Sequence, residues 1–326
     1  LGANEAPPAI ISIFLGEQLT DIIRSIAEGR NNGKGEADGW GGSFMEVGVS
    51  SLPKLPKDIS DRNRTSPFAF TGNKFEFRAV GSSQSIAPAN IALNAAVACA
   101  LDDIATEIEA AVSQGTPLNK AVQQTLAKLY TEHMPIVFNG NGYSDEWQKE
   151  AAERGLPNLK DSVSAVNHYS DPAVMEVFLR HGILSERELL ARQEILLENY
   201  IKVLHVETKL TQVMGRSVLL PAAVKWAKTA AELAVAAKSL GDGSVEEEYY
   251  GAIREHVAGL LAALKALDAK HAELDALDGV HARAEAARDM LLPLMAACRA
   301  HVDAREGMGD DALGPLPKDN EMLWQQ

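Results

Sequence analysis

The sequence predicts an α+β fold in which strands are confined to the first third of the chain and helices make up the rest. Short extended segments lie between residues 44 and 80, and residues 74–80 carry charged side chains among apolar ones, as in a strand with one polar face. From Pro117 onward, apolar residues recur at helical spacing between glycine and proline breaks.

The composition of the 326-residue chain is that of an ordinary globular protein. Its net charge of −14 argues against a nucleic-acid surface. The longest apolar run near the start, residues 9–16, is too short to span a bilayer. We therefore predict a cytoplasmic protein with no nucleic-acid partner and no membrane segment. Cys99 and Cys298 fall in alanine-rich helical patterns and are predicted to be small core residues in a reducing compartment.

The first helix is predicted to run from the prolines at residues 7 and 8 to Arg30, because isoleucine, leucine and phenylalanine recur there at helical spacing. The glycine-rich residues 31–42 are interpreted as a surface loop, since they lack the Gly-Lys-Ser/Thr ending of a phosphate-binding loop. Extended pieces follow around residues 44–50, 68–70 and 74–80.

A second long helix is predicted to open at Pro88 and to stop at residues 115–117, where glycine and proline interrupt it. A buried apolar stripe is expected along this helix: Ile91, Ala95, Ala98, Cys99, Leu101, Ile104 and Ile108. Further helices are predicted at residues 118–133, 145–154 and 172–180, and three or four long ones between residues 185 and 306.

Ser185 and Glu188 form a capping box at the start of the first long helix. Gly279 is expected to bend the helical region, and residues 310–326 are predicted to form a loop or a loosely docked tail. The Asn-Gly-Asn-Gly sequence at residues 139–142 marks a domain boundary, which predicts one domain at residues 1–140 and a helical one at residues 141–326.

The charged residues of the predicted strand are the main candidates for a functional site. Lys74, Glu76 and Arg78 would share one strand face, which places one carboxylate between two cations. Arg62 and Arg64 come just upstream. Arginine forks grip phosphate oxygens and a carboxylate suits Mg²⁺ or Mn²⁺, so the pattern indicates a phosphate and metal site. A solvated strand face with a row of charges is the alternative interpretation.

Other chemistry-bearing residues favour structural roles. Four histidines have no partner at helical spacing and are interpreted as surface or core-edge residues rather than metal ligands: His133, His168, His181 and His205. Trp147, Tyr249 and Tyr250 are predicted to pack within the protein rather than stack on a ligand. Neither cysteine has a base nearby in the sequence, so a covalent nucleophile is not predicted.

Three motifs, in this order, resemble the C-terminal half of the glutamine synthetase catalytic domain: Leu-Gly-Ala-Asn-Glu-Ala-Pro-Pro-Ala-Ile at residues 1–10, Asn-Arg-Thr at residues 63–65, and Phe-Glu-Phe-Arg at residues 75–78. The first motif and residues 61–68 are similar to the large type III branch. The motifs cover roughly residues 1 to 95, and the rest resembles that branch in length and helical character. Residues 1–140 would thus be the C-terminal part of the catalytic domain, and residues 141–326 a helical C-terminal region.

The resemblance implies ATP-dependent ligation of ammonia to glutamate, giving glutamine through γ-glutamyl phosphate. It implies ATP and Mg²⁺ or Mn²⁺ as cofactors, glutamate and ammonia as substrates, and a homo-oligomer, a double-ring dodecamer in the full-length family. The chain begins with Leu1 inside a motif. The other metal ligands and a glutamate-binding arginine lie upstream in the family, so we predict that this fragment alone is inactive.

The resemblance also implies roles for individual residues. Glu76 stands at a metal-ligand position, and Arg78 at that of an arginine that contacts the transferring phosphoryl group. The remaining positions are implied as follows: Arg64, which neutralises developing phosphate charge; Arg62 and Lys74, which bind ATP phosphates; and Glu5, a flap glutamate that takes a proton from ammonium.

One departure and two alternatives remain open. Ala69 stands where better-known branches of the family carry a further arginine. The role of that arginine would then be taken by Arg62 or by another residue. Another carboxylate–amine ligase of the same superfamily is one alternative. A non-catalytic helical scaffold or assembly module that retains motif remnants is the other. Intact charged residues at Glu5, Arg64, Glu76 and Arg78 argue against such decay.

Overall fold

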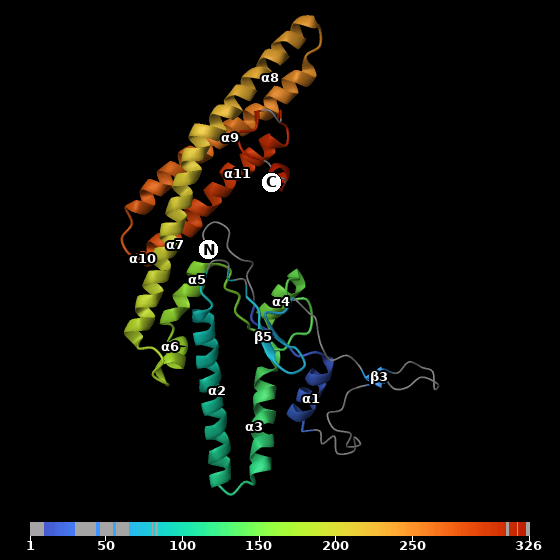
Figure 1. Cartoon of the computed structure of the whole chain (residues 1–326), viewed down its shortest axis with the longest axis vertical. Coiled ribbons are helices and arrows are strands. Elements are labelled where there is room, and N and C mark those ends of the chain that lie inside the picture. Colours follow the sequence, from blue (N-terminus) through green and yellow to red (C-terminus); the bar gives the residue numbers. More distant parts are fainter. Residues whose placement is uncertain are drawn as a thin grey trace. The chain divides into compact units, whose positions relative to one another are not determined.

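The computed structural model describes residues 10–29, 44–45, 55–56, 65–79, 81, 84–310, 313–317 and 319–323. The chain forms two compact units, Ala6–Leu189 and Leu190–Gln326. Helices dominate the described residues of both units, and a small sheet lies in the first, so the fold is α+β as the sequence predicts (Figure 1).

The small sheet has the strand order β1-β4-β5. β1 (Ile13–Phe14) runs parallel to β4 (Phe68–Phe70), and β4 pairs antiparallel with β5 (Phe75–Phe77). The β4–β5 hairpin closes tightly, because the backbone N–H of Thr71 donates to the carbonyl oxygen of Lys74 at 2.8 Å. A separate two-stranded ladder joins β2 (Phe44–Met45) to β3 (Leu55–Pro56). The extended segments expected from the sequence are therefore present.

The prediction that the first helix starts at residues 7 and 8 is wrong for the described part of that segment. α1 spans Glu17–Ala27, and the residues from Ile10 to Gly16 precede it without helical structure. β1 lies at one end of the strand order, where Ile13 pairs with Phe68 of β4 and also forms an isolated parallel bridge with Val137. These long-range pairings outweigh the helical spacing of the apolar residues.

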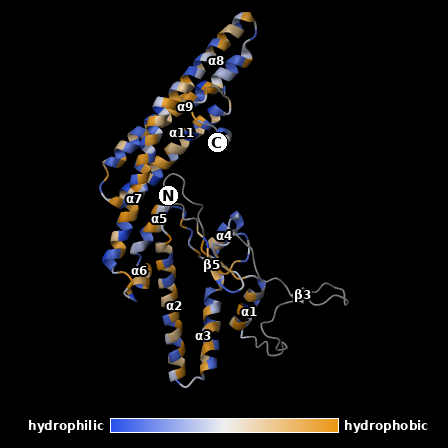
Figure 2. Cartoon of the chain, viewed as in Figure 1, coloured by the Kyte–Doolittle hydropathy of each residue, from blue (hydrophilic) through white to orange (hydrophobic). Residues whose placement is uncertain are grey.

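α2 (Ala87–Ser113) and α3 (Leu118–His133) form a helical hairpin in the first unit (Figure 1). The bounds of α3 match the prediction. Lys128 of α3 forms an ion pair with Glu107 of α2 at 3.0 Å. The predicted buried stripe of α2 is wrong over much of its length, because Ala95 and Cys99 are its buried residues, whereas Leu101 is 61% exposed. Figure 2 shows apolar residues along much of this helix.

Short helices complete the first unit: η1 (Met134–Ile136), α4 (Asp145–Glu153), α5 (Ser162–Asn167), η2 (His168–Ser170) and α6 (Pro172–Leu179). The sequence predicted α4 and α6 but not α5. Trp147 of α4 is buried against Ile10 and stacks on Phe138 with ring centroids 3.7 Å apart. The expected packing role of Trp147 is therefore confirmed.

The second unit is built from long helices: α7 (Glu186–Met214), η3 (Gly215–Leu219), α8 (Leu220–Leu240), α9 (Ser244–Asp275), α10 (Val280–Ala286), η4 (Ala287–Leu291), α11 (Leu292–Glu306) and α12 (Asp319–Leu323). The first residues of α7 belong to the first unit. Both α8 and α11 pack against α9. Among the described helices, none combines the length and the apolar composition needed to cross a bilayer.

Two details of these helices follow from their sequences. The predicted capping box is confirmed, because the N–H of Ser185 donates to Glu188 Oε2 at 2.8 Å and the N–H of Glu188 donates to Ser185 Oγ at 3.3 Å. The segments η3 and η4 are single π turns, and a proline, Pro221 or Pro293, follows each by two residues. Proline lacks an N–H and crowds the preceding turn, which accounts for the widened turns.

Both cysteines are buried and free, as expected. Burial raises the pKa of the Cys298 thiol. Tyr249 packs edge-on against Trp226, and its hydroxyl donates to the carbonyl oxygen of Met308 at 3.0 Å. Its predicted packing role is therefore confirmed.

Candidate functional site

The three charged side chains around β5 meet on one face of the strand, as the sequence alternation predicts. Lys74 Nζ lies 3.2 Å from Glu76 Oε1, and Arg78 Nη2 lies 3.0 Å from Glu76 Oε2. Each carboxylate oxygen of Glu76 thus faces a different cation. The side chains of Lys74, Glu76 and Arg78 are 65%, 36% and 27% exposed, so a dissolved ligand can reach all three.

This arrangement keeps Glu76 ionised. The hydrogen bond from Arg78, and next the one from Lys74, lower the pKa of the Glu76 carboxyl. At neutral pH the face therefore holds one carboxylate and two cations. An ionised carboxylate can bind a hard divalent cation, and an arginine and a lysine can bind phosphate oxygens, so the group offers both kinds of contact.

The hairpin fixes Arg78 relative to the chain that precedes β4. The N–H of Arg78, the residue after β5, donates to the carbonyl oxygen of Pro67, the residue before β4, at 2.7 Å. On the hairpin itself, the Phe68 and Phe75 rings stack with centroids 5.4 Å apart. Cross-strand aromatic pairs stabilise a two-stranded ribbon and hold its register. The charged residues are therefore carried on a braced hairpin rather than on a free loop.

The loop at residues 139–142 braces the same region. Asn139 Oδ1 accepts hydrogen bonds at 3.1 Å from the backbone N–H groups of both Leu15 and Gly16, and its Nδ2 donates to Thr20 Oγ1 at 2.9 Å. A Cβ added to Gly142 would lie 2.3 Å from the carbonyl oxygen of Thr65. The loop therefore contacts both the β1–α1 junction and the segment that leads into β4.

The structure places only some of the predicted site residues. It brings together Lys74, Glu76 and Arg78. The other three candidates, Glu5, Arg62 and Arg64, lie outside the described residues. Thr65, which directly follows Arg64, is described and lies beside Gly142. The roles assigned to all six residues stay predictions.

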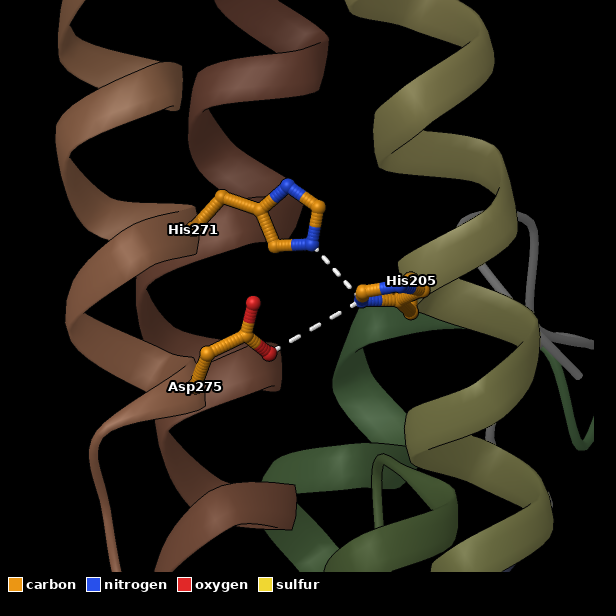
Figure 3. Close-up of side chains that lie close together, drawn as sticks. All are labelled: His205, His271 and Asp275. Carbon is orange, nitrogen blue, oxygen red and sulfur yellow. Dashed lines mark hydrogen bonds and ion pairs between the residues drawn. The ribbon is translucent and has the colours of Figure 1, made fainter.

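A second polar cluster lies in the unit Leu190–Gln326 and was missed by the sequence analysis. His205 of α7 was interpreted as a surface or core-edge residue rather than a metal ligand. Its Nδ1 lies 2.7 Å from His271 Nε2 and 4.0 Å from an Asp275 carboxylate oxygen (Figure 3). A search for partners at helical spacing could not find His271, because it lies 66 residues away in the chain. The four-residue spacing of His271 and Asp275 was the available sequence signal.

Known proteins of similar sequence bear on what this chain is. Residues 121–238 match the family described as the glutamine synthetase C-terminal domain. The "Type-3 glutamine synthetase" of Dictyostelium discoideum is 39% identical over 99% of this chain and 44% of its own length. The "Glutamine synthetase" of Bacteroides fragilis is 35% identical over 99% of this chain and 45% of its own length.

A third relative, the "Glutamine synthetase" of Butyrivibrio fibrisolvens, is 38% identical over 84% of this chain and 36% of its own length. The chain thus spans less than half the length of each of these three relatives. Nearly all of the chain aligns with two of them, well beyond the motifs near its start. Over nearly its whole length the chain is therefore similar to glutamine synthetases, one of them a type III enzyme, and its residues 121–238 match their C-terminal domain.

Proposed function

We propose that this chain is part of an enzyme that ligates ammonia to glutamate with ATP, forming glutamine through γ-glutamyl phosphate. The observation that carries the proposal is the cluster of Glu76 on β5 with Lys74 and Arg78 at its two ends, in which a single carboxylate is held between two cations. The names of the three relatives support the same reaction. Because the chain spans less than half of their length, the 326 residues alone are expected to be inactive.

Glu76 is proposed as one ligand of Mg²⁺ or Mn²⁺. Its carboxylate fits such an ion because it is ionised, partly exposed and carried on a strand. Two carboxylate oxygens offer about four lone pairs, so Glu76 can keep contact with Arg78 while an ion takes another direction. A divalent ion bound there would neutralise charge on the nucleotide phosphates. One carboxylate is too few for a complete site, which requires further ligands from the rest of the protein.

Arg78 is proposed to contact the phosphoryl group as it moves from ATP to glutamate. Its Nη2 contacts one oxygen of Glu76, and its backbone is tied to Pro67, so the guanidinium is held in place before substrate binds. Such preorganised cations are most effective where charge develops in a transition state. Lys74, Arg62 and Arg64 are proposed to bind other phosphate oxygens.

Glu5 is proposed to close over bound glutamate and to take a proton from ammonium. A general base in this role must be within hydrogen-bond reach of the proton and shielded from water. The loop at residues 139–142 contributes by holding Thr65, and with it the chain next to Arg64. Residues 1–140 are thus proposed as the part of this chain that contributes to catalysis, and residues 141–326 as the helical region.

We also propose that the complete protein is a cytoplasmic homo-oligomer, with twelve subunits as the resemblance implies. Apolar residues exposed on α2 support a contact between subunits, namely Val97, Leu101 and Val112, because monomeric proteins rarely leave such residues grouped in water. Sedimentation velocity of the full-length protein tests this. A protein that remains a monomer at micromolar concentration would contradict it.

The reaction is tested by ATP-dependent formation of γ-glutamyl hydroxamate from glutamate and hydroxylamine. The assay compares the complete open reading frame that encodes this chain, its Arg78→Ala variant, and the 326-residue chain. We expect activity in the first, a loss of about 100-fold or more in the second, and none in the third.

Arg180→Ala is the matched control, because Arg180 is a similarly exposed arginine that pairs with Asp103 far from β5 in the sequence. It should keep nearly full activity. A complete protein that folds but has no such activity would favour the scaffold or assembly alternative. Activity with glutamate and an amine other than ammonia would favour the other carboxylate–amine ligases.

A further inference from the structure

Three side chains of the second unit direct ligand atoms toward one another (Figure 3). His205 comes from α7, whereas His271 and Asp275 come from α9, where a spacing of four residues places them one turn apart on the same face. One ligand atom from each residue lies within 4.8 Å of the others. Among the residues that the structure describes, this is the one group of histidine, cysteine or acidic side chains that meets this condition.

We propose that His205 Nδ1, His271 Nε2 and a carboxylate oxygen of Asp275 bind one Zn²⁺ ion, which links α7 to α9. Two imidazoles and a carboxylate suit zinc better than Mg²⁺, which prefers oxygen ligands alone. The side chains of His205 and Asp275 are 30% and 52% exposed. The ion therefore has a path from solvent, and water can fill the fourth position of a tetrahedron.

The distances from His205 Nδ1 to its two partners require only small side-chain movements. With Zn–N bonds of about 2.0–2.1 Å, the ligand atoms of a tetrahedral site lie roughly 3.3 Å apart. The nitrogens of His205 and His271 are 2.7 Å apart, and His205 Nδ1 and Asp275 Oδ1 are 4.0 Å apart. To bind zinc, the two histidine nitrogens must move slightly apart, and His205 Nδ1 and Asp275 Oδ1 must move slightly closer together. Asp275 is the last residue of α9, and its exposed side chain is free to turn toward the ion.

The hydrogen bonds around the imidazoles favour the required protonation. His271 Nδ1 lies 3.4 Å from Gln212 Oε1, a partner that favours a proton on Nδ1 and leaves the Nε2 lone pair directed at His205. His205 then donates its own Nδ1 proton to His271 Nε2. Metal binding requires that this proton leave Nδ1 and that another be taken up at Nε2 from solvent. The ion thus replaces a proton that already lies between the two nitrogens.

The surrounding charges favour a neutral His271 and a bound cation. Burial, and next the charge of His205, lower the pKa of His271, so its imidazole is neutral at pH 7. Asp275 and Asp268 attract a cation at this position, whereas Lys209 opposes it. Arg283 Nη2 lies 3.9 Å from Asp275 Oδ1, the outer limit of an ion pair, and therefore holds this carboxylate only weakly against a metal.

Zinc binding is tested by isothermal titration calorimetry on the 326-residue chain with Mg²⁺ in excess, which occupies carboxylate sites that prefer hard ions. We expect one Zn²⁺ per chain. The affinity should fall by about tenfold or more in both His205→Gln and Asp275→Asn. His168→Gln is the matched control, because it removes another histidine that contacts an aspartate, Asp171, outside the cluster. It should leave the affinity unchanged.

Co²⁺ provides an independent measurement, since a tetrahedral site gives Co²⁺ a strong visible absorption that octahedral hydration does not. This absorption should appear in the wild-type chain and be lost in His205→Gln. Circular dichroism verifies that each variant is folded, and both substituted positions are partly exposed. Absence of stoichiometric zinc binding by the folded chain, or an affinity unchanged in either variant, would overturn the proposal.

Discussion

Replacing Gly142 with alanine should destabilise the first unit through a single contact. The added Cβ would lie 2.3 Å from the carbonyl oxygen of Thr65, whereas a carbon and a carbonyl oxygen in contact need about 3.3 Å. The loop or the segment before β4 must therefore move by about 1 Å, and such overpacking costs about 1–3 kcal/mol. Gly142 does not have a positive φ, so this cost comes from the contact and not from the backbone conformation.

Differential scanning calorimetry measures the effect as a lower unfolding temperature, by about 2–4 °C for each kcal/mol in a unit of this size. Gly251→Ala is the control, because Gly251 lies within α9 and a Cβ there meets no atom within 4 Å. That substitution should stabilise the protein by about 0.5–1 kcal/mol. A Gly142→Ala chain that unfolds at or above the wild-type temperature would refute the close packing of this loop against Thr65.

Three further predictions follow from individual side chains. The pKa of His271 is lowered in the folded chain, so the unfolded chain takes up a proton there more readily as the pH falls. The contribution of a neutral His271 to the free energy of unfolding is therefore complete above about pH 6.5 and is lost below it. His271→Gln should reduce this pH dependence in thermal unfolding. Ser185→Ala removes half of the capping box with Glu188 and should lower the free energy of unfolding by about 1 kcal/mol, so an unchanged urea midpoint would contradict it. Burial raises the pKa of the Cys298 thiol, so a thiol reagent at neutral pH should modify it only in unfolded chain; rapid modification of native chain would contradict this.

Local sequence signals predicted the elements whose ends are set by local chemistry. The bounds of α3 follow from Pro117 at its start, and the capping box of Ser185 and Glu188 marks the start of α7. β4 and β5 were predicted as extended segments at residues 68–70 and 74–80, although their pairing was not; Gly72 between them has the positive φ of 90° that favours glycine. In each case the stabilising contacts involve residues close together in the chain.

Contacts between distant residues explain what could not be predicted. Ile13 was assigned to a helix because its apolar neighbours have helical spacing, but its partners Phe68 and Val137 lie far along the chain. The apolar stripe of α2 was correctly recognised as apolar, yet periodicity does not reveal what covers a helix face. Leu101 remains exposed among the described residues, although it shares the pattern of Ala95.

The two candidate sites also differ in whether their contacts join residues that are close together or far apart in the chain. Lys74, Glu76 and Arg78 lie within five residues in and beside β5, so alternation alone placed them together. His205 and His271 belong to different helices, and their contact depends on the packing of the second unit. A single sequence does not specify which faces of α7 and α9 meet.

The Mg²⁺ dependence of glutamine formation in Glu76→Gln tests the central claim most directly, because glutamine keeps the size of the side chain and removes its charge. In the complete protein, the Mg²⁺ concentration for half-maximal activity should rise by about tenfold or more. Glu107→Gln is the matched control, since Glu107 is similarly exposed and pairs with Lys128 on α3; its Mg²⁺ requirement should equal that of the wild type. A Glu76→Gln enzyme with full activity and an unchanged Mg²⁺ requirement would contradict the assignment of this strand to the metal and nucleotide site.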